Sequence, residues 1–482
     1  MKYEFKTKPF AHQDSVLRGS WNRPYYGLFM EMGTGKTKVA IDNIGILYKQ
    51  KSINAALILA PKGVFGNWTD KEFPAHLPDD MLEETMILQW QPNHTKTYAN
   101  EFHELMNRKE GLTILVMNIE ALSSAKGADH AMYFLMRYPD SMMIVDESTT
   151  IKNRSAQRTK NVVKLGKKAK YKRILTGSPI TKSPMDLFSQ CNFLSEDALG
   201  FKSYYAFQGR YAVVVNKTMG PKVFKDIVGY RRLDELTERL ESFSSRITKE
   251  ECLDLPEKIY QPRFIPLTDK QKPVYEQMRR LALAKLENGD LATTASVLTQ
   301  IMRMQQIVCG ILTTDDGEIQ EVDRVRLSNL MEVLEETSGK VVIWATFTHN
   351  ILQIREAIAK EYGEDSVACY YGATETEERT NIVRTFQDPD SPLRFFIGQP
   401  KTGGYGITLT AASTMVYFSN SYDLEIRLQS EDRIHRIGQP NHCTYIDFVT
   451  PGTVDEKILK ALRAKIDIAG EVLGEQGKEW LL

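Results

Sequence analysis

The sequence has few of the features that mark secreted, metal-binding or membrane proteins. Its five cysteines include no C-x-x-C pair, and its eight histidines show no ligand spacing, which argues against a disulfide framework and a zinc site. The strongest apolar run, residues 55–60, is far too short to cross a bilayer, and the first residues contain no apolar signal core. We therefore expect a protein of a reducing compartment, in the cytoplasm or the nucleus, with no membrane partner.

The chain also carries no excess of charge. Lys+Arg 62 equals Asp+Glu 62, so a site for a polyanion must be a local patch and not a field of the whole protein. An apolar content of 42% and a charged content of 26% are ordinary for a globular protein. With 482 residues the chain is long enough for roughly three average domains or two large ones.

Two series of short apolar runs alternate with helical patterns, which predicts two α/β lobes with buried parallel sheets. The runs of the first series are 28–30, 55–60, 113–117, 142–145 and 173–175. Those of the second are 341–345, 367–371, 393–397, 414–418 and 444–449. We expect the first lobe over residues 1–250, with a helical and hairpin protrusion at about 185–250. The second is expected over 251–482, with a helical insertion at about 265–335 and a C-terminal brace helix at about 454–482.

A glycine-rich segment follows the first run and opens a helical pattern. Its residues are Glu31, Met32, Gly33, Thr34, Gly35, Lys36 and Thr37. Glycines let backbone N–H groups close around phosphates at a helix N-terminus, while the lysine supplies charge to the β- and γ-phosphates and the Thr37 hydroxyl can bind Mg²⁺. The segment therefore predicts an ATP site, although a strict P-loop would begin with glycine where this chain has Met30. The alternative is a glycine turn before a helix.

An acidic pair, Asp146 and Glu147, ends the run 142–145. Carboxylates at the carboxyl edge of a parallel sheet lie where α/β folds bind ligands. We expect Asp146 to hold Mg²⁺ and Glu147 to orient and deprotonate the attacking water. Alone, such a pair is often only a turn.

A pair of arginines, Arg433 and Arg436, stands three residues apart near the end of the second lobe. This spacing puts both guanidinium groups on one face of a helix or helical turn, where each fork can hold phosphate oxygens. The glycine- and hydroxyl-rich loop 402–412 precedes them and is expected to approach phosphates closely, although such a loop is more often structural. From this lobe we include Gly404, Gly406 and Gln429 among the nucleotide contacts.

Weaker signals lie in the first lobe. Phe10 and Gln13 offer a ring to stack on adenine and an amide to read its edge. The turn Thr176–Pro179 can couple the nucleotide state to the second lobe, or serve as a plain turn. Trp68 is expected to pack in the core, and the alternative is a contact to the DNA backbone.

In order along the chain, these motifs resemble the Swi/Snf-related branch of helicase superfamily two. The matching residues are Phe10, Gln13, 31–37, 60–61, 67–68, 72–73, 118–122, 146–147, 151–153, 175–180, 183–184, Arg246, 254–256, 267–268, Gln271, Tyr275, 372–374, Arg379, Phe386, 403–412, 429–439 and 453–458. The resemblance implies two tandem RecA-like lobes that bind ATP and Mg²⁺ between them, with Arg433 and Arg436 as arginine fingers. It also implies tracking along double-stranded DNA without strand separation. Thr149 departs from the family's usual histidine.

Candidate contacts to the DNA backbone carry N–H, hydroxyl or ammonium donors, which read little sequence. They are Lys62, Asn118, Lys152, Thr346, Gly404 and Thr408. Residues 211–230 are predicted to form a β-hairpin, with a turn at 219–221, and we expect Lys217, Lys222 and Lys225 on it to grip the duplex.

Three functions stay open at this stage. The first is an ATP-driven double-stranded DNA translocase that remodels protein–DNA complexes or branched DNA in repair or recombination. We expect it to act as a monomer, with a DNA-bound protein as its target. The second is a strand-separating DNA or RNA helicase. The third is a nucleotide-gated nucleic-acid-binding scaffold, which is disfavoured because the five residues expected to be catalytic are all present. The absence of accessory modules suggests a bacterial or viral source, with host cytoplasm as the location if viral.

Overall fold

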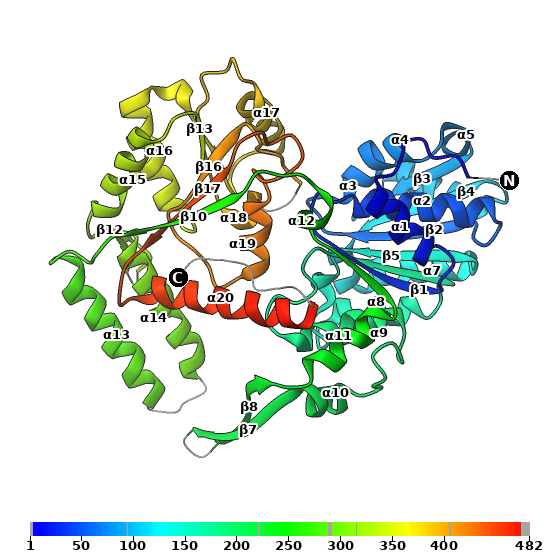
Figure 1. The fold of residues 1–482 in the computed structure, drawn as a ribbon, viewed down its shortest axis with the longest axis horizontal. Helices are drawn as coiled ribbons and strands as arrows, with labels where there is room; N and C mark the ends of the chain where they lie inside the picture. Colours follow the sequence, from blue (N-terminus) through cyan, green and yellow to red (C-terminus); the bar gives the residue numbers. More distant parts are fainter. Residues whose placement is uncertain are drawn as a thin grey trace. The chain divides into compact units, whose positions relative to one another are not determined.

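The computed structural model describes residues 3–93, 95–219, 222–287, 292–314, 316–403 and 406–473. The chain divides into two compact units. The first contains the chain up to Val213 with Gly229–Asp254 and residues 468–473, and the second contains Val214–Val228 and Leu255–Asp467. Each unit has its own parallel sheet with helices on its faces (Figure 1), so the expected fold class of two tandem RecA-like α/β lobes is confirmed. The division at residue 250 stays a prediction.

The first unit is built on a seven-stranded parallel sheet of order β3-β4-β2-β5-β6-β1-β9. The strands are β1 (Tyr25–Met30), β2 (Ala55–Ala60), β3 (Thr85–Gln89), β4 (Leu112–Asn118), β5 (Ser141–Asp146), β6 (Tyr171–Leu175) and β9 (Ser244–Ile247). Strands β2 and β5 are buried along their whole length, because helices cover both sheet faces, and this burial explains their continuous apolar sequence. The edge strands β3 and β9 are only half-buried and were not predicted.

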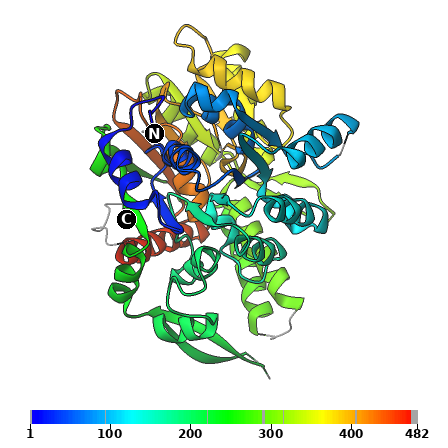
Figure 2. The same ribbon diagram turned by 90° about the vertical axis from the view of Figure 1, so that its right-hand side faces the viewer.

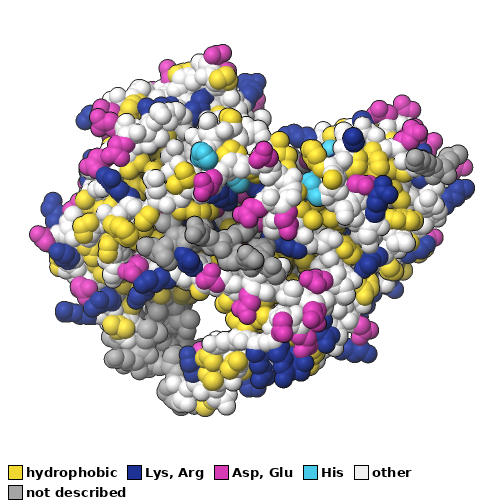
Figure 3. Space-filling model, in the orientation of Figure 1, with side chains coloured by type: hydrophobic (Ala, Val, Ile, Leu, Met, Phe, Trp, Pro, Cys, Tyr) yellow, Lys and Arg dark blue, Asp and Glu magenta, His cyan; other side chains and the backbone are white. Residues whose placement is uncertain are grey.

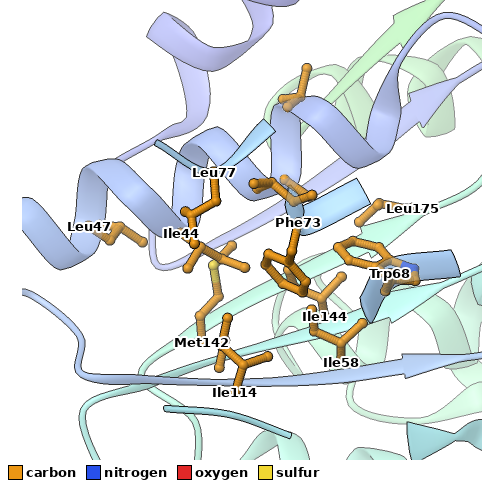
Figure 4. Packing of buried hydrophobic residues seen from close by; sticks show 14 of the residues in the cluster. Ile44, Leu47, Ile58, Trp68, Phe73, Leu77, Ile114, Met142, Ile144 and Leu175 are labelled. Carbon is orange, nitrogen blue, oxygen red and sulfur yellow. The ribbon is translucent and has the colours of Figure 1, made fainter. Parts of the chain in front are cut away.

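Helices surround the sheet of this unit, and several of them pack directly on its strands. They are α1 (Ala11–Ser20), α2 (Lys36–Lys49), α3 (Phe65–Asn67), α4 (Phe73–His76), α5 (Asp79–Glu83), α6 (Lys96–Asn107), α7 (Ala125–Arg137), α8 (Gln157–Gly166), α9 (Leu187–Leu194), α10 (Tyr204–Tyr211), α11 (Leu233–Glu241) and α12 (Lys249–Cys252), with a π-helical turn at Trp68–Glu72. In the core, Ile44 of α2 faces Ile58, Ile114 and Ile144 of the sheet (Figure 4).

The second unit has a six-stranded parallel sheet of order β10-β17-β16-β13-β15-β14. Its strands are β10 (Lys258–Phe264), β13 (Lys340–Trp344), β14 (Val367–Tyr370), β15 (Phe395–Gly398), β16 (Ala412–Tyr417) and β17 (Cys443–Val449). The helices are α13 (Gln271–Glu287), α14 (Ala292–Val308), α15 (Val325–Glu336), α16 (Thr348–Tyr362), α17 (Thr376–Gln387), α18 (Pro400–Gly403), α19 (Leu424–Glu431) and α20 (Val454–Leu473), with a small sheet of β11 (Ile311–Thr313) and β12 (Ile319–Glu321). The sheet separates two hydrophobic clusters, centred on Ile343 and on Trp344.

Strands β7 (Ala212–Met219) and β8 (Lys222–Tyr230) form a separate two-stranded sheet, visible as a narrow ribbon in Figure 2. The expected turn residues Gly220 and Pro221 lie outside the described residues. The part of the chain that the structure describes contains no helix that is both long and apolar enough to cross a membrane.

Candidate nucleotide and nucleic-acid sites

Three of the predicted motifs follow strands that are neighbours in the first sheet. Strand β6 lies between β5 and β1, and all three run parallel. The segment after β1, the acidic pair at the end of β5 and the turn from Thr176 after β6 therefore share the carboxyl edge. The structure thus brings together residues that lie more than a hundred positions apart in the sequence.

The glycine segment makes a tight turn between β1 and α2. Gly33 and Gly35 have φ of 83° and 89°, in the left-handed region that favours glycine. Thr34 Oγ1 donates to the Glu31 carbonyl at 2.7 Å, and Lys36 Nζ lies 3.4 Å from the same oxygen. Lys36 begins α2, so the free N–H groups of the helix N-terminus face the ligand position of a P-loop. Thr37 follows in the first helical turn, and Met32 is half-buried in the loop.

Gln13 lies directly against this loop. Its Nε2 donates to the Thr34 carbonyl at 3.0 Å, and its Oε1 accepts the Phe10 N–H at 3.0 Å. A Cβ atom on Gly35 would lie 2.1 Å from Gln13 Nε2, so a larger residue at this left-handed position would also displace the Gln13 amide. The Phe10 ring is 56% exposed and stacks on His12, with centroids 5.9 Å apart. Both predicted adenine residues are therefore beside the loop, and both ends of the Gln13 amide already have partners.

Asp146 is buried at the end of β5, and each of its carboxylate oxygens accepts one N–H. Trp68 Nε1 donates to Oδ2 at 3.0 Å and the Glu147 N–H donates to Oδ1 at 3.0 Å. Burial raises the pKa of Asp146, while the Trp68 hydrogen bond and the charge of Lys36 act in the opposite direction. Glu147 adopts a left-handed conformation with φ 47°, which is uncommon for a residue with a side chain and recurs at functional sites.

The residues at this edge fit a magnesium ion. The Thr37 hydroxyl and the Asp146 carboxylate offer the oxygen ligands that Mg²⁺ prefers. Within the described ranges no group of three or more His, Cys, Asp and Glu side chains could hold a metal ion.

Arg246 on β9 joins the start of the glycine segment to the turn after β6. It donates to Glu31 Oε1 at 3.2 Å and to the Gly177 carbonyl at 2.9 Å. Glu31 Oε2 in turn accepts the Lys249 N–H at 2.9 Å. Arg246 was expected only in a linking segment, and Trp68 was expected in the core or on the DNA backbone. Both partnerships span long stretches of chain, so no local spacing could have predicted them.

Two hydrogen-bonded links connect the segments that follow β5 and β6. Ser148 Oγ donates to Gln190 Oε1 at 2.7 Å, and Gln190 Nε2 donates to the Pro179 carbonyl at 2.8 Å. Lys152 Nζ donates to Thr181 Oγ1 at 2.7 Å. The acidic pair and the Thr176–Pro179 turn are therefore mechanically connected within this unit, partly through Gln190, which sequence analysis missed.

In the second unit, Arg433 and Arg436 lie in the turns beyond the end of α19, not on the helix itself. Both reach the Ile407 carbonyl, with Nη1 at 3.0 Å and 3.4 Å respectively, and Arg436 Nη1 also donates to Thr408 Oγ1 at 2.8 Å. Burial lowers the pKa of Arg436. The pair is thus held on the glycine- and hydroxyl-rich loop.

The neighbours of the pair also contribute. The Gln429 carbonyl accepts Arg433 Nε at 3.0 Å. Gly406 has φ 76°, in the left-handed region, whereas Gly404 lies outside the described residues.

A buried ionic cluster fixes the end of α19. Arg427 donates to Glu431 Oε1 at 2.7 Å and through Nη2 to Asp447 Oδ2 at 2.8 Å. Lys258 and Tyr260 of β10 both contact Glu431 Oε2, at 3.2 Å and 2.7 Å. Burial acts to raise the pKa of Glu431, but the charges of Lys258 and Arg427 bring it to about 2. This cluster, which was not predicted, holds the helix that leads into Arg433.

The candidate DNA contacts of the first unit separate into two places. Strand β4 pairs with β2 so that Asn118 lies opposite Ala60, which brings Asn118 close to the loop that carries the exposed Lys62. The Lys62 N–H donates to Glu120 Oε2 at 3.2 Å. Lys152 lies at a different place, where its Nζ donates to Thr181 Oγ1.

Three candidates of the second unit and the hairpin, Thr346, Thr408 and Lys217, already have partners. The Thr346 N–H donates to Ser419 Oγ at 2.8 Å, and Thr408 accepts from Arg436. Lys217 forms an ion pair with Asp226 at 2.5 Å, which partly neutralises it. The side chain of Lys222 lies outside the described residues, and Lys225 is exposed. Basic and acidic side chains are intermixed on the face shown in Figure 3.

Comparison with known proteins covers most of the chain. The SNF2-related domain matches residues 22–311, and the helicase conserved C-terminal domain matches residues 325–438. The chain is 26% identical over 466 residues to the putative ATP-dependent helicase/translocase YwqA of Bacillus subtilis (strain 168), covering 94% of this chain and 46% of that protein. It is 26% identical over 471 residues to the transcription regulatory protein SNF2 of Saccharomyces cerevisiae, covering 92% of this chain and 26% of that protein.

Among solved structures, the Sulfolobus solfataricus SWI2/SNF2 ATPase core in complex with dsDNA is similar, with 24% identity and a TM-score of 0.44 over 98% of this chain and 95% of that one. The chain spans less than half the length of the two curated relatives.

Proposed function

Because the chain belongs to the SNF2-related family, we propose that it is an ATP-driven translocase on double-stranded DNA that remodels protein–DNA complexes or branched DNA. The observation that carries this proposal is the shared carboxyl edge of the first sheet. There a P-loop with Lys36 and Thr37 lies at the same edge as the buried Asp146 and the left-handed Glu147. This set contains a phosphate cradle, metal-binding oxygens and a general base, which are the parts that nucleotide hydrolysis needs.

In the proposed reaction each residue has a separate role. The N–H groups from Gly33 to Thr37 and the Lys36 ammonium bind the phosphates, and Glu147 orients the attacking water and accepts its proton. Bound Mg²⁺, held by Thr37 and Asp146, would supply positive charge to the phosphate oxygens. Phe10 and Gln13 are proposed to bind the adenine.

Arg433 and Arg436 are proposed to stabilise the charge that develops during phosphoryl transfer. Arginines in this role contribute about 10³–10⁵ in turnover. The hydrogen bonds to Ile407 and Thr408 fix the direction of both guanidinium groups. Fixed donors cost little reorganisation when the charge appears, which is why such pre-organised groups are effective. Gly404, Gly406 and Gln429 are proposed as further nucleotide contacts.

Duplex DNA is the proposed track. Lys62 and Asn118 lie on neighbouring strand ends and offer donors suited to phosphate oxygens, so we expect little sequence preference. Lys152, Thr346 and Thr408 are proposed as further backbone contacts. We propose that the protein acts as a monomer on DNA, with a DNA-bound protein as a possible target.

A strand-separating helicase is the second candidate. The observation that favours it is the separate β7–β8 ribbon, which exposes Val223 and Phe224.

The two functions differ in their substrates, which makes the test direct. ATP hydrolysis is measured with blunt duplex, single-stranded DNA and RNA, together with triplex displacement and fork unwinding. The translocase predicts stimulation by blunt duplex and displacement of the third strand without fork unwinding. Unwinding of forks with preferential stimulation by single strands would favour the helicase, and no stimulation by any nucleic acid would reject both.

A further inference from the structure

One contact at the nucleotide site has no role in the reaction described above. The indole of Trp68 is 1% exposed and donates to Asp146 Oδ2 at 3.0 Å, across 78 residues of chain. Trp68 also begins the π-helical turn Trp68–Glu72, and π-turns are rare and frequent at functional sites. Building on the proposed function, we infer that Trp68 is a positioning residue: it orients Asp146, and it makes that orientation respond to DNA bound at the loop 61–67.

At its buried end, the segment 61–68 fixes the Asp146 carboxylate from one side. The Trp68 bond and the Glu147 N–H hold one oxygen each, so the plane of the carboxylate is set while further lone pairs stay available for a metal ion. The indole is neutral, and therefore it orients the carboxylate without cancelling its charge. The Trp68 ring is itself held by Phe73, with centroids 5.9 Å apart, and Figure 4 shows its nitrogen at the edge of the packed cluster.

At its other end, the segment 61–68 reaches solvent. Lys62 is exposed, and its N–H is tied to Glu120 beside Asn118, where the DNA backbone is proposed to bind. Between the two ends the chain consists of consecutive turns. The Val64 N–H donates to the Pro61 carbonyl at 2.9 Å, and the Asn67 N–H donates to the Val64 carbonyl at 2.9 Å. A stiff segment of this kind passes a displacement of Lys62 on to Trp68.

The alternative is that Trp68 only fills the core. This alternative predicts that any change at Trp68 acts through stability alone. The positioning role predicts instead that removal of the indole N–H changes catalysis while the ring packing is kept. Trp90, a second buried indole of the same unit, offers a matched control.

The experiment compares Trp68→Phe with Trp90→Phe and the wild-type chain. Basal and duplex-stimulated ATP turnover, the KM for ATP and the melting temperature are measured for each. A hydrogen bond to a charged group implies a loss of about 10-fold to 100-fold in duplex-stimulated turnover for Trp68→Phe. We expect the KM for ATP to stay within about 2-fold, because P-loop binding of the phosphates is unchanged, and the ratio of stimulated to basal turnover to fall. Trp90→Phe is expected to keep the wild-type ratio.

A second measurement tests whether the effect passes through Asp146. Magnesium-dependent binding of a non-hydrolysable ATP analogue is compared in the wild-type and Asp146→Asn backgrounds. Trp68→Phe is expected to raise the half-saturating Mg²⁺ concentration in the first background and to have no effect in the second. If Trp68→Phe does not fold, β-(3-benzothienyl)alanine at position 68 removes the N–H while it keeps the bicyclic ring.

The outcomes separate this inference from the proposed function. An unchanged ratio of stimulated to basal turnover in the Trp68 variant, or equal losses in the Trp68 and Trp90 variants, would overturn the inference. A wild-type chain whose ATP turnover does not respond to duplex would instead overturn the proposed function.

Discussion

The buried cluster around Glu431 leads to a prediction about stability. The Glu431 side chain is fully buried, and both of its oxygens face donors: Arg427 on one side, and Lys258 with Tyr260 on the other. Glu431→Gln replaces one oxygen by an NH₂ group, which then meets a donor whichever way the amide is turned. We expect this substitution to destabilise the second unit and to disorder the turn that carries Arg433.

The magnitude follows from the pKa of Glu431. Its ordinary value of 4.5 falls to about 2 in the folded protein, which corresponds to about 3 kcal/mol of favourable interaction with the carboxylate form. This agrees with the ~3–5 kcal/mol lost when one partner of a buried ion pair is removed. For a unit of this size, about 2–4 °C of melting temperature is lost per kcal/mol, so we expect a decrease of about 6–12 °C.

The stabilisation that Glu431 contributes depends on pH with a definite sign. Since the pKa of Glu431 is lowered by folding, its contribution is fully present above pH 4.5 and is lost as the pH falls toward 2. The difference in unfolding free energy between wild type and Glu431→Gln is therefore largest near neutral pH and shrinks in acid. Urea unfolding followed by circular dichroism at several pH values measures this difference.

A matched control is Glu332→Gln in the same unit, where Glu332 pairs with Arg263 at the surface. Exposed pairs contribute little, so this variant should stay within about 0.5 kcal/mol of wild type. The reasoning is refuted if the melting temperature of Glu431→Gln equals that of the control. It is also refuted if the loss of unfolding free energy relative to wild type stays constant down to pH 3.

Four further predictions concern ATP turnover and DNA binding. Lys36→Ala should abolish turnover and weaken nucleotide binding, because it removes the charge on the phosphates. Glu147→Gln should abolish turnover while ATP stays bound, as a filter-binding assay would show. Arg436→Ala should lower turnover by about 10³-fold or more with a much smaller loss of nucleotide affinity. Lys62→Ala should lower duplex affinity and reduce the salt slope of binding by about one, whereas Lys109→Ala, an exposed change at the opposite sheet edge, should do neither. Normal turnover in one of the first three variants would remove that residue from the mechanism, and an unchanged salt slope would remove Lys62 from the DNA path.

The sequence predicted the sheets well where burial leaves a clear pattern. The run 55–60 coincides with β2, because a central parallel strand is apolar on both faces. Strand β10 was missed, because it lies at a sheet edge and alternates between half-buried and exposed residues. The two arginines were expected on a helix or helical turn, and they lie in the turns that follow α19, which ends at Glu431. Their guanidinium groups still converge, because both bond to the Ile407 carbonyl.

For the candidate site, the limit of sequence reasoning has a physical origin. Motif spacing predicts which groups do chemistry, because a P-loop or an acidic pair is built from neighbours in the chain. The side chains that hold those groups in place come from elsewhere in the fold: Trp68 holds Asp146, Arg246 holds Glu31, and Lys258 holds Glu431. These contacts span 78, 215 and 173 residues, so they exist only once the sheets have formed. If orientation of the reacting groups accounts for much of the rate, substitutions at such distant partners should impair turnover more than their distance from the motifs suggests.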